Sequence, residues 1–316
     1  IGLFKSDETE FTAENALATT TSADDGSFSF TNVPYGDWVL KELESPEGFI
    51  LSDEVIPVTV EEDGQVVEIS LANERVYGDL RLTKVDKDYP DNKLTGAEFE
   101  VYRDTNGNKE LDEGDELLGK LEETSTGSYE MSHILYGGVF VRETKAPEGF
   151  LLDENAYYVE ITENGKIYEV ENEAGIGFTN MAQTGSLRIE KTSSDGKVEG
   201  FSFRVTGANG YDQTFKTDKN GEIFIEGLRV GDYTVSEVSD GASANYVLPA
   251  DKKVTILADK TTVAQMHNEL RDTPKTGDDS KPWLWAALMG VSAMGAAALG
   301  VAAYVGKRKK DNHTAK

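Results

Sequence analysis

The chain has 316 residues, enough for two or three domains of ordinary size. Its 58 acidic and 31 basic residues give a formal charge of −27, which argues against nucleic-acid binding because phosphates require a basic surface. There is no cysteine, so disulfides and thiol chemistry are excluded. None of the three histidines (His133, His267 and His313) has a plausible metal-ligand partner close by in sequence, and there is no Ser/His/Asp set, so a conventional enzyme is not expected.

Short runs of alternating apolar residues, separated by Asp, Asn and Gly turns, dominate the chain. Gly26–Phe30, Val55–Val60, Phe201–Val205 and Ile223–Ile225 are examples, and we expect each to form a strand. No stretch before residue 283 has the periodicity of an amphipathic helix. The sequence therefore predicts an all-β protein made of tandem Ig-like β-sandwiches.

A fifteen-residue segment recurs and defines these units. Tyr35–Phe49 and Tyr136–Phe150 match along their whole length, and Val230–Val238 is a shorter third copy. Each copy has a Gly turn, then alternating apolar residues, then one acid. The acids are Glu42, Glu143 and Glu237.

A second repeat opens two of the units with a strand that ends in Lys. Gly78–Lys84 matches Gly185–Lys191, and an Asn stands eleven residues before each Lys, namely Asn73 and Asn180. The third equivalent is Asn268. The Glu-to-Asn separation is 31 residues in the first and third units and 37 in the middle one. A complete unit thus has Lys on its first strand, Glu on a middle strand and Asn on its last.

These repeats place the units at residues 1–76, 77–182 and 183–271. Ile1–Lys5 aligns with Phe99–Arg103, so the first unit begins at a second strand and Lys5 takes the place of an Arg. We expect its Lys-bearing first strand about fifteen residues upstream, which makes this unit N-terminally truncated. In the middle unit Asn172 competes with Asn180, and the equal spacing to the next Lys favours Asn180.

Lys, Glu and Asn together can form a covalent bond. Burial disfavours the charged form of Lys and leaves it nucleophilic, and it also keeps Glu protonated. A neutral Glu beside an Asn amide can polarise its carbonyl and move a proton as ammonia leaves. We expect a Lys–Asn isopeptide bond, formed once without a cofactor and with no other catalysis. The ordinary alternative is strand Lys and Glu facing solvent and an Asn that satisfies a turn.

The patterns Gly-x-Leu-x-Leu/Ile-x-Lys, Leu-Thr-Gly-Ala-x-Phe-x-Val-Tyr and Gly-x-Tyr/Phe-x-Val-x-Glu-x-x-Ala-Pro-Glu-Gly-Phe resemble the CnaB-type domains of Gram-positive surface proteins, the prealbumin-like, SpaA-type pilin modules. The similarity covers residues 1–271. In the third unit Ser-Asp-Gly-Ala-Ser replaces Ala-Pro-Glu-Gly. The resemblance implies the triads Lys84/Glu143/Asn180 and Lys191/Glu237/Asn268, with Glu42 and Asn73 as the remaining part of a third.

An insertion in the middle unit is rich in oxygen-bearing side chains. Asp104–Asp115 is close to an EF-hand-like loop, in which hard oxygen ligands surround one Ca²⁺. Gly at position 4 rather than 6, and Asp rather than Glu at position 12, are departures from that pattern, and a metal-free hairpin is the alternative. The candidate ligands are Asp104, Asn106, Asn108, Glu110, Asp112 and Asp115.

The C-terminal part predicts an anchor. A polar linker at residues 272–282 precedes an uncharged span, Trp283–Val305, which is long enough to cross a bilayer as a helix over residues 283–306. A basic tail at 307–316 is expected in the cytoplasm. The linker contains Thr273, Pro274, Lys275, Thr276 and Gly277, which resemble the LPXTG sorting signal with Thr in place of Leu.

The resemblance implies that a sortase cleaves between Thr276 and Gly277 and joins the chain to peptidoglycan. We therefore expect an extracellular, wall-anchored stalk of an adhesin on a Gram-positive bacterium, with a membrane-held precursor and a host matrix or surface ligand as partner. The alternative is a pilus subunit polymerised by a sortase. That alternative needs a reactive Lys in a pilin motif, of which Tyr89–Asn92 is only a partial match.

Overall fold

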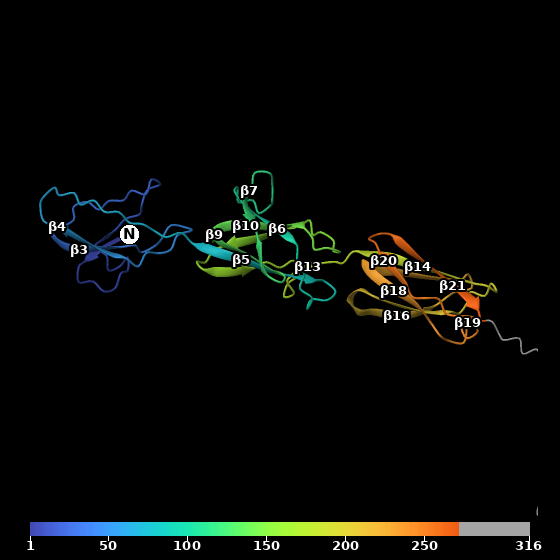
Figure 1. Cartoon of the computed structure of the whole chain (residues 1–316). Coiled ribbons are helices and arrows are strands. Elements are labelled where there is room, and N and C mark those ends of the chain that lie inside the picture. The colour runs from blue at the N-terminus through green and yellow to red at the C-terminus, as the bar shows by residue number, and fades with distance from the viewer. Residues whose placement is uncertain (272–316) are drawn as a thin grey trace, which may run out of the picture.

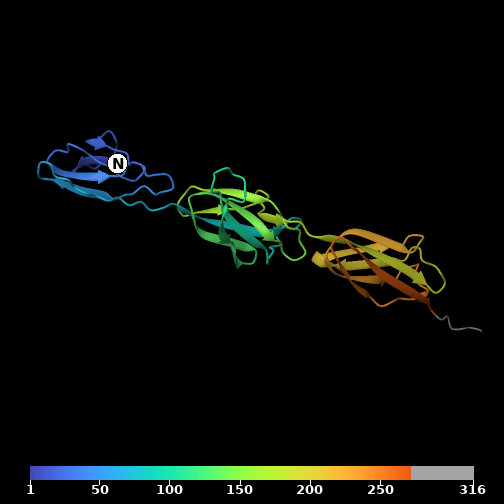
Figure 2. The same cartoon turned by 90° about the horizontal axis from the view of Figure 1, so that it is seen from above.

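The computed structural model describes residues 1–271, which form three β-sheet modules arranged in a row (Figures 1 and 2). We call residues 1–76 module 1, residues 77–182 module 2 and residues 183–271 module 3. The predicted all-β class is confirmed: the one helical element in this range is the short 3₁₀ helix η1 (Ala208–Gly210). The predicted C-terminal helix lies outside the described residues, and residues 1–271 hold no helix long and apolar enough to cross a membrane.

Module 3 consists of two four-stranded sheets, with strand orders β17-β14-β21-β19 and β16-β15-β18-β20. The first strand, β14, lies between β17 and β21; it is antiparallel to β17 and parallel to β21, the last strand. The strands are β14 (Thr184–Ser193), β15 (Ser202–Gly207), β16 (Tyr211–Lys216), β17 (Glu222–Arg229), β18 (Gly231–Val238), β19 (Tyr246–Val247), β20 (Lys252–Ile256) and β21 (Thr261–Leu270).

Module 2 repeats this plan, with sheet orders β11-β10-β6-β7 and β12-β5-β9-β8. Its last strand is split into two short pieces, β12 and β13, that both run parallel to β5. The strands are β5 (Tyr77–Asp86), β6 (Glu98–Arg103), β7 (Glu116–Lys120), β8 (Glu122–Ser125), β9 (Ser128–Leu135), β10 (Gly137–Lys145), β11 (Ala156–Ile161), β12 (Lys166–Glu169) and β13 (Phe178–Asn180).

The first strand of each complete module faces the core with every second residue, as the period of a β-strand requires. In β14 the buried positions are Gly185, Leu187, Ile189 and Lys191, so the Lys continues the row of apolar side chains. β5 has the same pattern. The pleat of the strand therefore carries the Lys into the interior.

Module 1 has one hydrogen-bonded sheet, in the order β2-β1-β3-β4. Its strands are β1 (Gly2–Lys5), β2 (Ala18–Thr19), β3 (Gly36–Lys41) and β4 (Val55–Val60). Lys5 pairs with Trp38 in β3, just as Arg103 of β6 pairs with Val139 in β10. This register supports the predicted alignment of β1 with β6, and the strand expected at Val55–Val60 is confirmed.

The strand expected at Gly26–Phe30 is wrong, since these residues form no strand. Their equivalents in the other modules, β9 and β17, are hydrogen-bonded to β5 and β14. Among residues 1–271 no strand takes that central place in module 1. Gly26–Phe30 alternates apolar and polar residues as a strand does, but among the described residues no central strand is hydrogen-bonded to it.

The two junctions between modules differ in burial. Between modules 1 and 2 the Tyr136 hydroxyl donates to Glu47 Oε1 at 2.6 Å in an exposed contact. Between modules 2 and 3 the Arg229 guanidinium forms a bidentate pair with the buried carboxylate of Asp86 and also contacts Asp88 at 2.6 Å. Its Cζ lies 4.8 Å from the centre of the Tyr89 ring.

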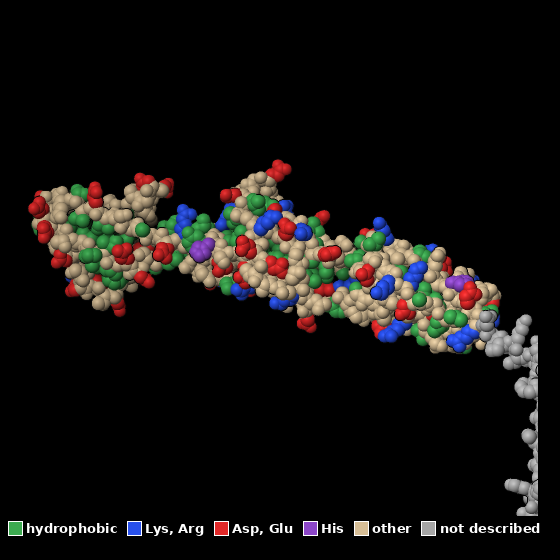
Figure 3. All heavy atoms as spheres, in the orientation of Figure 1, with side chains coloured by type: hydrophobic (Ala, Val, Ile, Leu, Met, Phe, Trp, Pro, Cys, Tyr) green, Lys and Arg blue, Asp and Glu red, His purple; other side chains and the backbone are tan. Residues whose placement is uncertain are grey.

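At this second junction one guanidinium faces two carboxylates, those of Asp86 and Asp88. Burial acts to raise the pKa of Asp86, but the hydrogen bonds and charge of Arg229 outweigh it and hold that pKa below its usual value. The same pairing raises the pKa of Arg229. Both groups therefore stay ionised. Elsewhere, acidic side chains are spread over the face of the molecule that Figure 3 shows.

Candidate cross-linking sites

Module 2 brings Lys84, Glu143 and Asn180 together in its interior. They come from β5, β10 and the end of β13, and their exposed fractions are 0%, 1% and 3%. Lys84 Nζ lies 3.4 Å from Glu143 Oε1, and Asn180 Nδ2 donates to Glu143 Oε2 at 2.7 Å. The carboxyl group therefore stands between the amine and the amide, with one oxygen facing each.

An aromatic ring covers the amine. Nζ of Lys84 lies 4.9 Å from the centre of the Phe178 ring and donates to the Phe178 carbonyl at 3.2 Å. Burial lowers the pKa of Lys84 to about 8, against the opposing effect of the Glu143 charge. A larger fraction of this amine is neutral near pH 7 than in an ordinary Lys, and only the neutral amine is a nucleophile.

The structure places Asn180, and not Asn172, at the acid. Asn172 Nδ2 donates to Asp153 Oδ2 and to the Thr179 carbonyl, both at 2.8 Å, and its Oδ1 accepts from the Thr179 N–H. The Asn172 amide is thus fully used in holding the turn before β13. The spacing to the next Lys, which favoured Asn180, agrees with this geometry.

Two buried oxygens of the module 2 site, Glu143 Oε1 and Asn180 Oδ1, accept no hydrogen bond. Unpaired buried polar atoms are uncommon and costly, and they need a physical reason. Glu143 Oε1 instead faces the Lys84 amine in an ion pair at 3.4 Å and can take its proton. The other oxygen, Oε2, already touches the amide nitrogen that would leave, so this arrangement is suited to moving a proton from nucleophile to leaving group.

Module 3 builds the same acid–amide pair. Asn268 Nδ2 donates to Glu237 Oε1 at 2.6 Å, and Glu237 Oε2 and Asn268 Oδ1 accept no hydrogen bond. Burial raises the pKa of Glu237, which favours the protonated carboxyl group. Burial also lowers the pKa of Lys191, whose exposed fraction is 2%.

The Lys of module 3 is turned differently from that of module 2. Lys191 Nζ donates to the Thr192 carbonyl at 2.5 Å and lies 4.2 Å from the centre of the Phe201 ring. It makes no ion pair with Glu237, in contrast to Lys84 and Glu143. A rotation of the flexible Lys side chain is therefore needed before this amine can reach Asn268.

Module 1 contains the acid and the amide without the Lys. Asn73 Nδ2 donates to Glu42 Oε1 and Oε2 at 2.8 and 2.7 Å and to the Ile50 carbonyl at 3.3 Å, and the Ser52 N–H donates to Glu42 Oε2. The corresponding donors and acceptors in module 2 are Asn180, Leu151 and Asp153, so the two pairs are held by equivalent contacts. Lys5 is exposed, as expected for a residue in the place of Arg103.

The predicted calcium loop folds on its own hydrogen bonds. Asp104 accepts from the Gly107 and Lys109 N–H groups, and Asp112 Oδ2 accepts from the side-chain amides of Asn106 and Asn108. Asp115 accepts from the Thr105 and Asp112 N–H groups, while Glu110 is exposed. Within residues 1–271 no three acidic or His side chains are grouped closely enough to hold a metal ion.

Sequence reasoning missed the aromatic rings that cover the two Lys side chains. Phe178 stands two residues before Asn180, a spacing at which two strand residues share a face, and this was the available signal. Phe201 comes from the start of the next strand, and no spacing rule pointed to it. The predicted sorting signal, Thr273 to Gly277, lies outside the described residues.

Modules 2 and 3 each bury a Lys from the first strand, a Glu from a middle strand and an Asn from the last strand within a two-sheet module. A family model for the SpaA prealbumin-like fold domain matches residues 1–75, 78–174 and 185–270. The chain therefore belongs to the SpaA family of prealbumin-like fold domains. This confirms the tandem prealbumin-like fold expected from the sequence.

Solved structures give a similar result on the fold. The Bacillus anthracis TIE protein is 26% identical with a TM-score of 0.63, and the match covers 79% of this chain but only 44% of that protein. The minor pilin GBS52 of Streptococcus agalactiae is 18% identical (TM-score 0.29, 63% of this chain and 98% of that one). A streptococcal ancillary pilin is 17% identical (TM-score 0.29, 76% and 77%). The last two superpositions are too loose to support an argument, and a search of curated proteins gave no match.

Proposed function

We propose that this chain is the stalk of a Gram-positive cell-surface protein in which modules 2 and 3 are each closed by a Lys–Asn isopeptide bond. One observation carries the proposal: Lys84 is fully buried, 3.4 Å from a carboxyl group that also holds the Asn180 amide. Burying a charged amine costs several kcal/mol. Formation of the amide bond would remove that charge from the interior, which accounts for an amine at this position.

The reaction is a transfer of the Asn acyl group from ammonia to Lys. Nζ of Lys84 attacks Cγ of Asn180, a new C–N bond forms, and the bond from Cγ to Nδ2 breaks. Glu143 takes a proton on the side facing Nζ and delivers one to the departing nitrogen, which leaves as ammonia. Glu237 has the same role for Lys191 and Asn268 once the amine has rotated.

Intact-mass measurement tests this reaction. Each bond expels one ammonia, so the purified 316-residue chain should weigh about 34 Da less than its sequence predicts. Glu143→Gln should leave a deficit of about 17 Da, because only module 3 can then react. Asn172→Ala is the matched control and should keep the full deficit. A chain at its full sequence mass would exclude the bonds, as would tryptic peptides in which Lys84 is not linked to Asn180 and Lys191 is not linked to Asn268.

We propose further that the chain is fixed to peptidoglycan by a sortase that cuts after Thr276, with the uncharged span and basic tail holding the precursor in the membrane. Support comes from the order of these three sequence features. Mass spectrometry of wall digests should find Thr276 joined to a peptidoglycan amine. An intact C-terminus in the membrane fraction would oppose this, and high-molecular-weight ladders would indicate a polymerised pilus subunit instead.

A further inference from the structure

One edge strand of module 2 lacks the protection that its counterparts carry. β4, β11 and β20 occupy the same place in modules 1, 2 and 3, because each is the outermost strand of its sheet and pairs with β3, β10 or β18. The outer edge of such a strand presents backbone N–H and C=O groups, to which another extended chain can add. The three edges can therefore be compared position by position.

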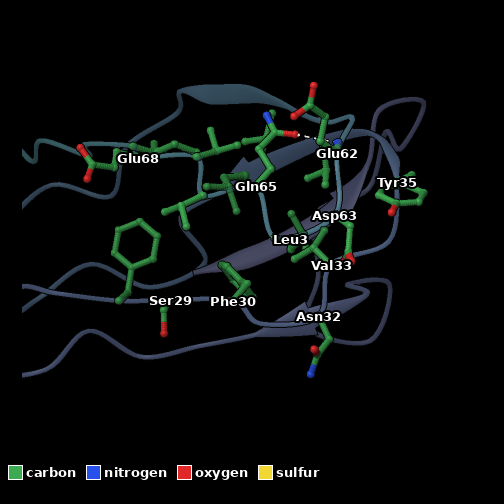
Figure 4. Close-up of a pocket in the computed structure, with 18 of the residues that line it drawn as sticks. Leu3, Ser29, Phe30, Asn32, Val33, Tyr35, Glu62, Asp63, Gln65 and Glu68 are labelled. Carbon is green, nitrogen blue, oxygen red and sulfur yellow. Dashed lines mark hydrogen bonds between the residues drawn. The ribbon is translucent and has the colours of Figure 1, made fainter.

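The position in the middle of the edge distinguishes module 2 from the other modules. It is occupied by Pro57 in β4, Tyr158 in β11 and Lys253 in β20. Pro cannot donate a backbone hydrogen bond to an added strand, and Lys places a charge on the edge, so both oppose strand addition, whereas Tyr does not. The side chains of Val58 and Val60 in β4 line the pocket of module 1 shown in Figure 4, but Pro57 protects the backbone edge of that strand.

Pro57 also indicates which backbone groups of β11 face outwards. A Pro nitrogen carries no hydrogen, so in β4 it lies on the side away from β3. Because β11 pairs with β10 in the same register, the N–H and C=O of Tyr158 point away from β10, as do those of Ala156 and Glu160 two residues to either side. Outside the pairing with β10, these three residues make no backbone hydrogen bond with any residue of 1–271.

The two large side chains of β11 are turned away from the free edge. The Tyr158 ring lies back over β10, against Gly138, where a Cβ atom would overlap the Tyr158 ring and hydroxyl. The Tyr157 ring points into the module and lies 5.1 Å from the ring of Phe178. Neither ring therefore covers the outward N–H and C=O groups.

The inward face of this edge is apolar. Tyr157 and Val159 pack against the core of module 2 and remain partly exposed. An added strand with apolar residues at alternate positions would place them beside these two side chains and bury more of their surface. The residues between them would lie on the outer face of the sheet, beside Glu160.

The surroundings of the edge are acidic. Residues 151–166, which include β11 and the turns on both sides of it, contain four acids and one Lys. Glu160 is the one charged residue of β11, and although it lies 3.3 Å from Lys109 Nζ its side chain is 52% exposed. A second copy of the chain would set the same acids against each other, whereas a segment with Lys or Arg on its outer face would be attracted.

We propose that the free edge of β11 binds an extended segment of another protein, in which apolar residues alternate with Lys or Arg, as a fifth strand of the sheet β11-β10-β6-β7. Hydrogen bonds to Ala156, Tyr158 and Glu160 hold the segment. Its apolar residues cover Tyr157 and Val159, and its basic residues lie beside Glu160. This binding uses none of the Lys, Glu and Asn residues of the cross-linking sites, so it does not depend on the proposed isopeptide bonds.

The test uses the purified 316-residue chain and a fluorescent, N-acetylated peptide of the sequence Lys-Val-Lys-Val-Lys-Val-Lys. Saturable binding is expected. A peptide with the same residues in the order Lys-Lys-Lys-Lys-Val-Val-Val has the same charge without the alternation, and should bind roughly tenfold more weakly because it cannot place its apolar residues on one face. Equal binding of the two peptides would overturn the proposal, since it would reflect general attraction to an acidic surface, and so would the absence of saturable binding.

Two substitutions transfer the protection of the other modules to β11. Tyr158→Pro copies module 1 and should weaken binding of the alternating peptide roughly tenfold, because the edge loses its central donor. Tyr158→Lys copies module 3 and should weaken it to a similar extent by repelling the basic peptide. Pro57 shows that the fold accepts Pro at this position, and Lys253→Pro in β20 is the matched control, which should leave binding unchanged. Full binding by both Tyr158 variants would overturn the proposal.

Hydrogen exchange locates the peptide on the unaltered chain. The bound peptide should slow exchange of the Tyr158 and Glu160 amides roughly tenfold and leave that of the Lys253 amide unchanged. Protection of Lys253 without protection of Tyr158 would overturn the proposal. A dimer of the chain that occupies β11 and excludes the peptide would do so as well.

Discussion

Module 1 and module 3 have the same Glu-to-Asn separation of 31 residues, yet their interiors differ greatly. Fifteen buried hydrophobic residues make up the core cluster of module 3, and only four make up that of module 1. The acid–amide contact is nevertheless formed in both, with Nδ2 within 2.8 Å of a carboxyl oxygen. In both modules the acid–amide contact is therefore formed by a middle strand (β18 in module 3, β3 in module 1) and the last segment of the module. The first strand is not needed for this contact, and in module 3 it supplies the amine and much of the core.

The largest expected effect is the difference between the stability changes of modules 3 and 1 when the acid of each is replaced by Gln. Glu237→Gln should lower the free energy of unfolding of module 3 by about 4 kcal/mol, because a bond that closes a loop of this length restricts the unfolded chain. In the 316-residue chain tested by itself, Glu42→Gln should change the stability of module 1 by less than about 1 kcal/mol, since residues 1–76 place no Lys amine against Glu42 and Asn73. Urea unfolding followed module by module measures both. Equal effects of the two substitutions would contradict the comparison.

The pH dependence of the stability of module 2 tests whether burial lowers the pKa of the Lys84 amine. In Asn180→Ala no bond forms, and Lys84 keeps a pKa of about 8 when folded against 10.5 when unfolded. Between these values the unfolded chain binds the extra proton, so the free energy of unfolding should rise with pH, by about 3 kcal/mol in total. Below about pH 8 both states are protonated and this contribution to stability is absent.

Measurement of this effect needs a reference chain in which the amine is missing. Asn180→Ala combined with Lys84→Met should lack the rise between pH 8 and 10.5, and the difference between the two chains isolates Lys84. Parallel curves for the two chains would show that the Lys84 pKa is not lowered by burial.

A third prediction compares the two junctions. Arg229→Met removes the guanidinium from Asp86, leaves the buried carboxylate with the Asp88 N–H as its remaining donor, and should cost about 2 kcal/mol. Tyr136→Phe removes only the exposed contact with Glu47 and should cost about 0.5 kcal/mol. Thermal unfolding of both variants gives the two values. A cost for Arg229→Met as small as that for Tyr136→Phe would mean that Asp86 is readily hydrated.

The smallest effect concerns the Asp104–Asp115 segment, which is an insertion relative to module 3. If the loop of Asp104, Asn106, Asn108, Glu110, Asp112 and Asp115 closes around Ca²⁺, the ion should stabilise module 2 by about 1 kcal/mol at a concentration about five times Kd. Asp112→Asn should remove this gain, and Glu113→Gln, at an exposed neighbour, should preserve it. A calorimetric titration without heat, together with an unchanged thermal midpoint, would exclude the ion.

Much of this organisation could be predicted from spacing alone. The 31-residue separations identified Glu42 with Asn73 and Glu237 with Asn268, because two strands at fixed places in one fold keep their distance along the chain. The alternation in Gly185–Lys191 also predicted correctly that Lys191 continues the row of inward side chains. These features depend on local pattern and on repetition, both of which a sequence displays.

Other features depend on what lies beside a segment, and spacing could not supply them. Gly26–Phe30 alternates like a strand but has no strand next to it in the described residues. Arg229 and Asp86 are 143 residues apart, and nothing in either segment indicates that they meet. The turn of Lys191 towards the Thr192 carbonyl is a choice of side-chain rotamer, which a sequence pattern does not determine.

The parallel arrangement of first and last strands has a mechanical consequence. Lys191 and Asn268 both lie near the C-terminal ends of β14 and β21, so a bond between them would connect the far end of β14 to the point where the chain leaves the module. A pull on the chain would then travel along β14, cross one covalent bond and exit, while residues 192–267 carried no load. Such a module would not lengthen under force, because the load would bypass most of its residues.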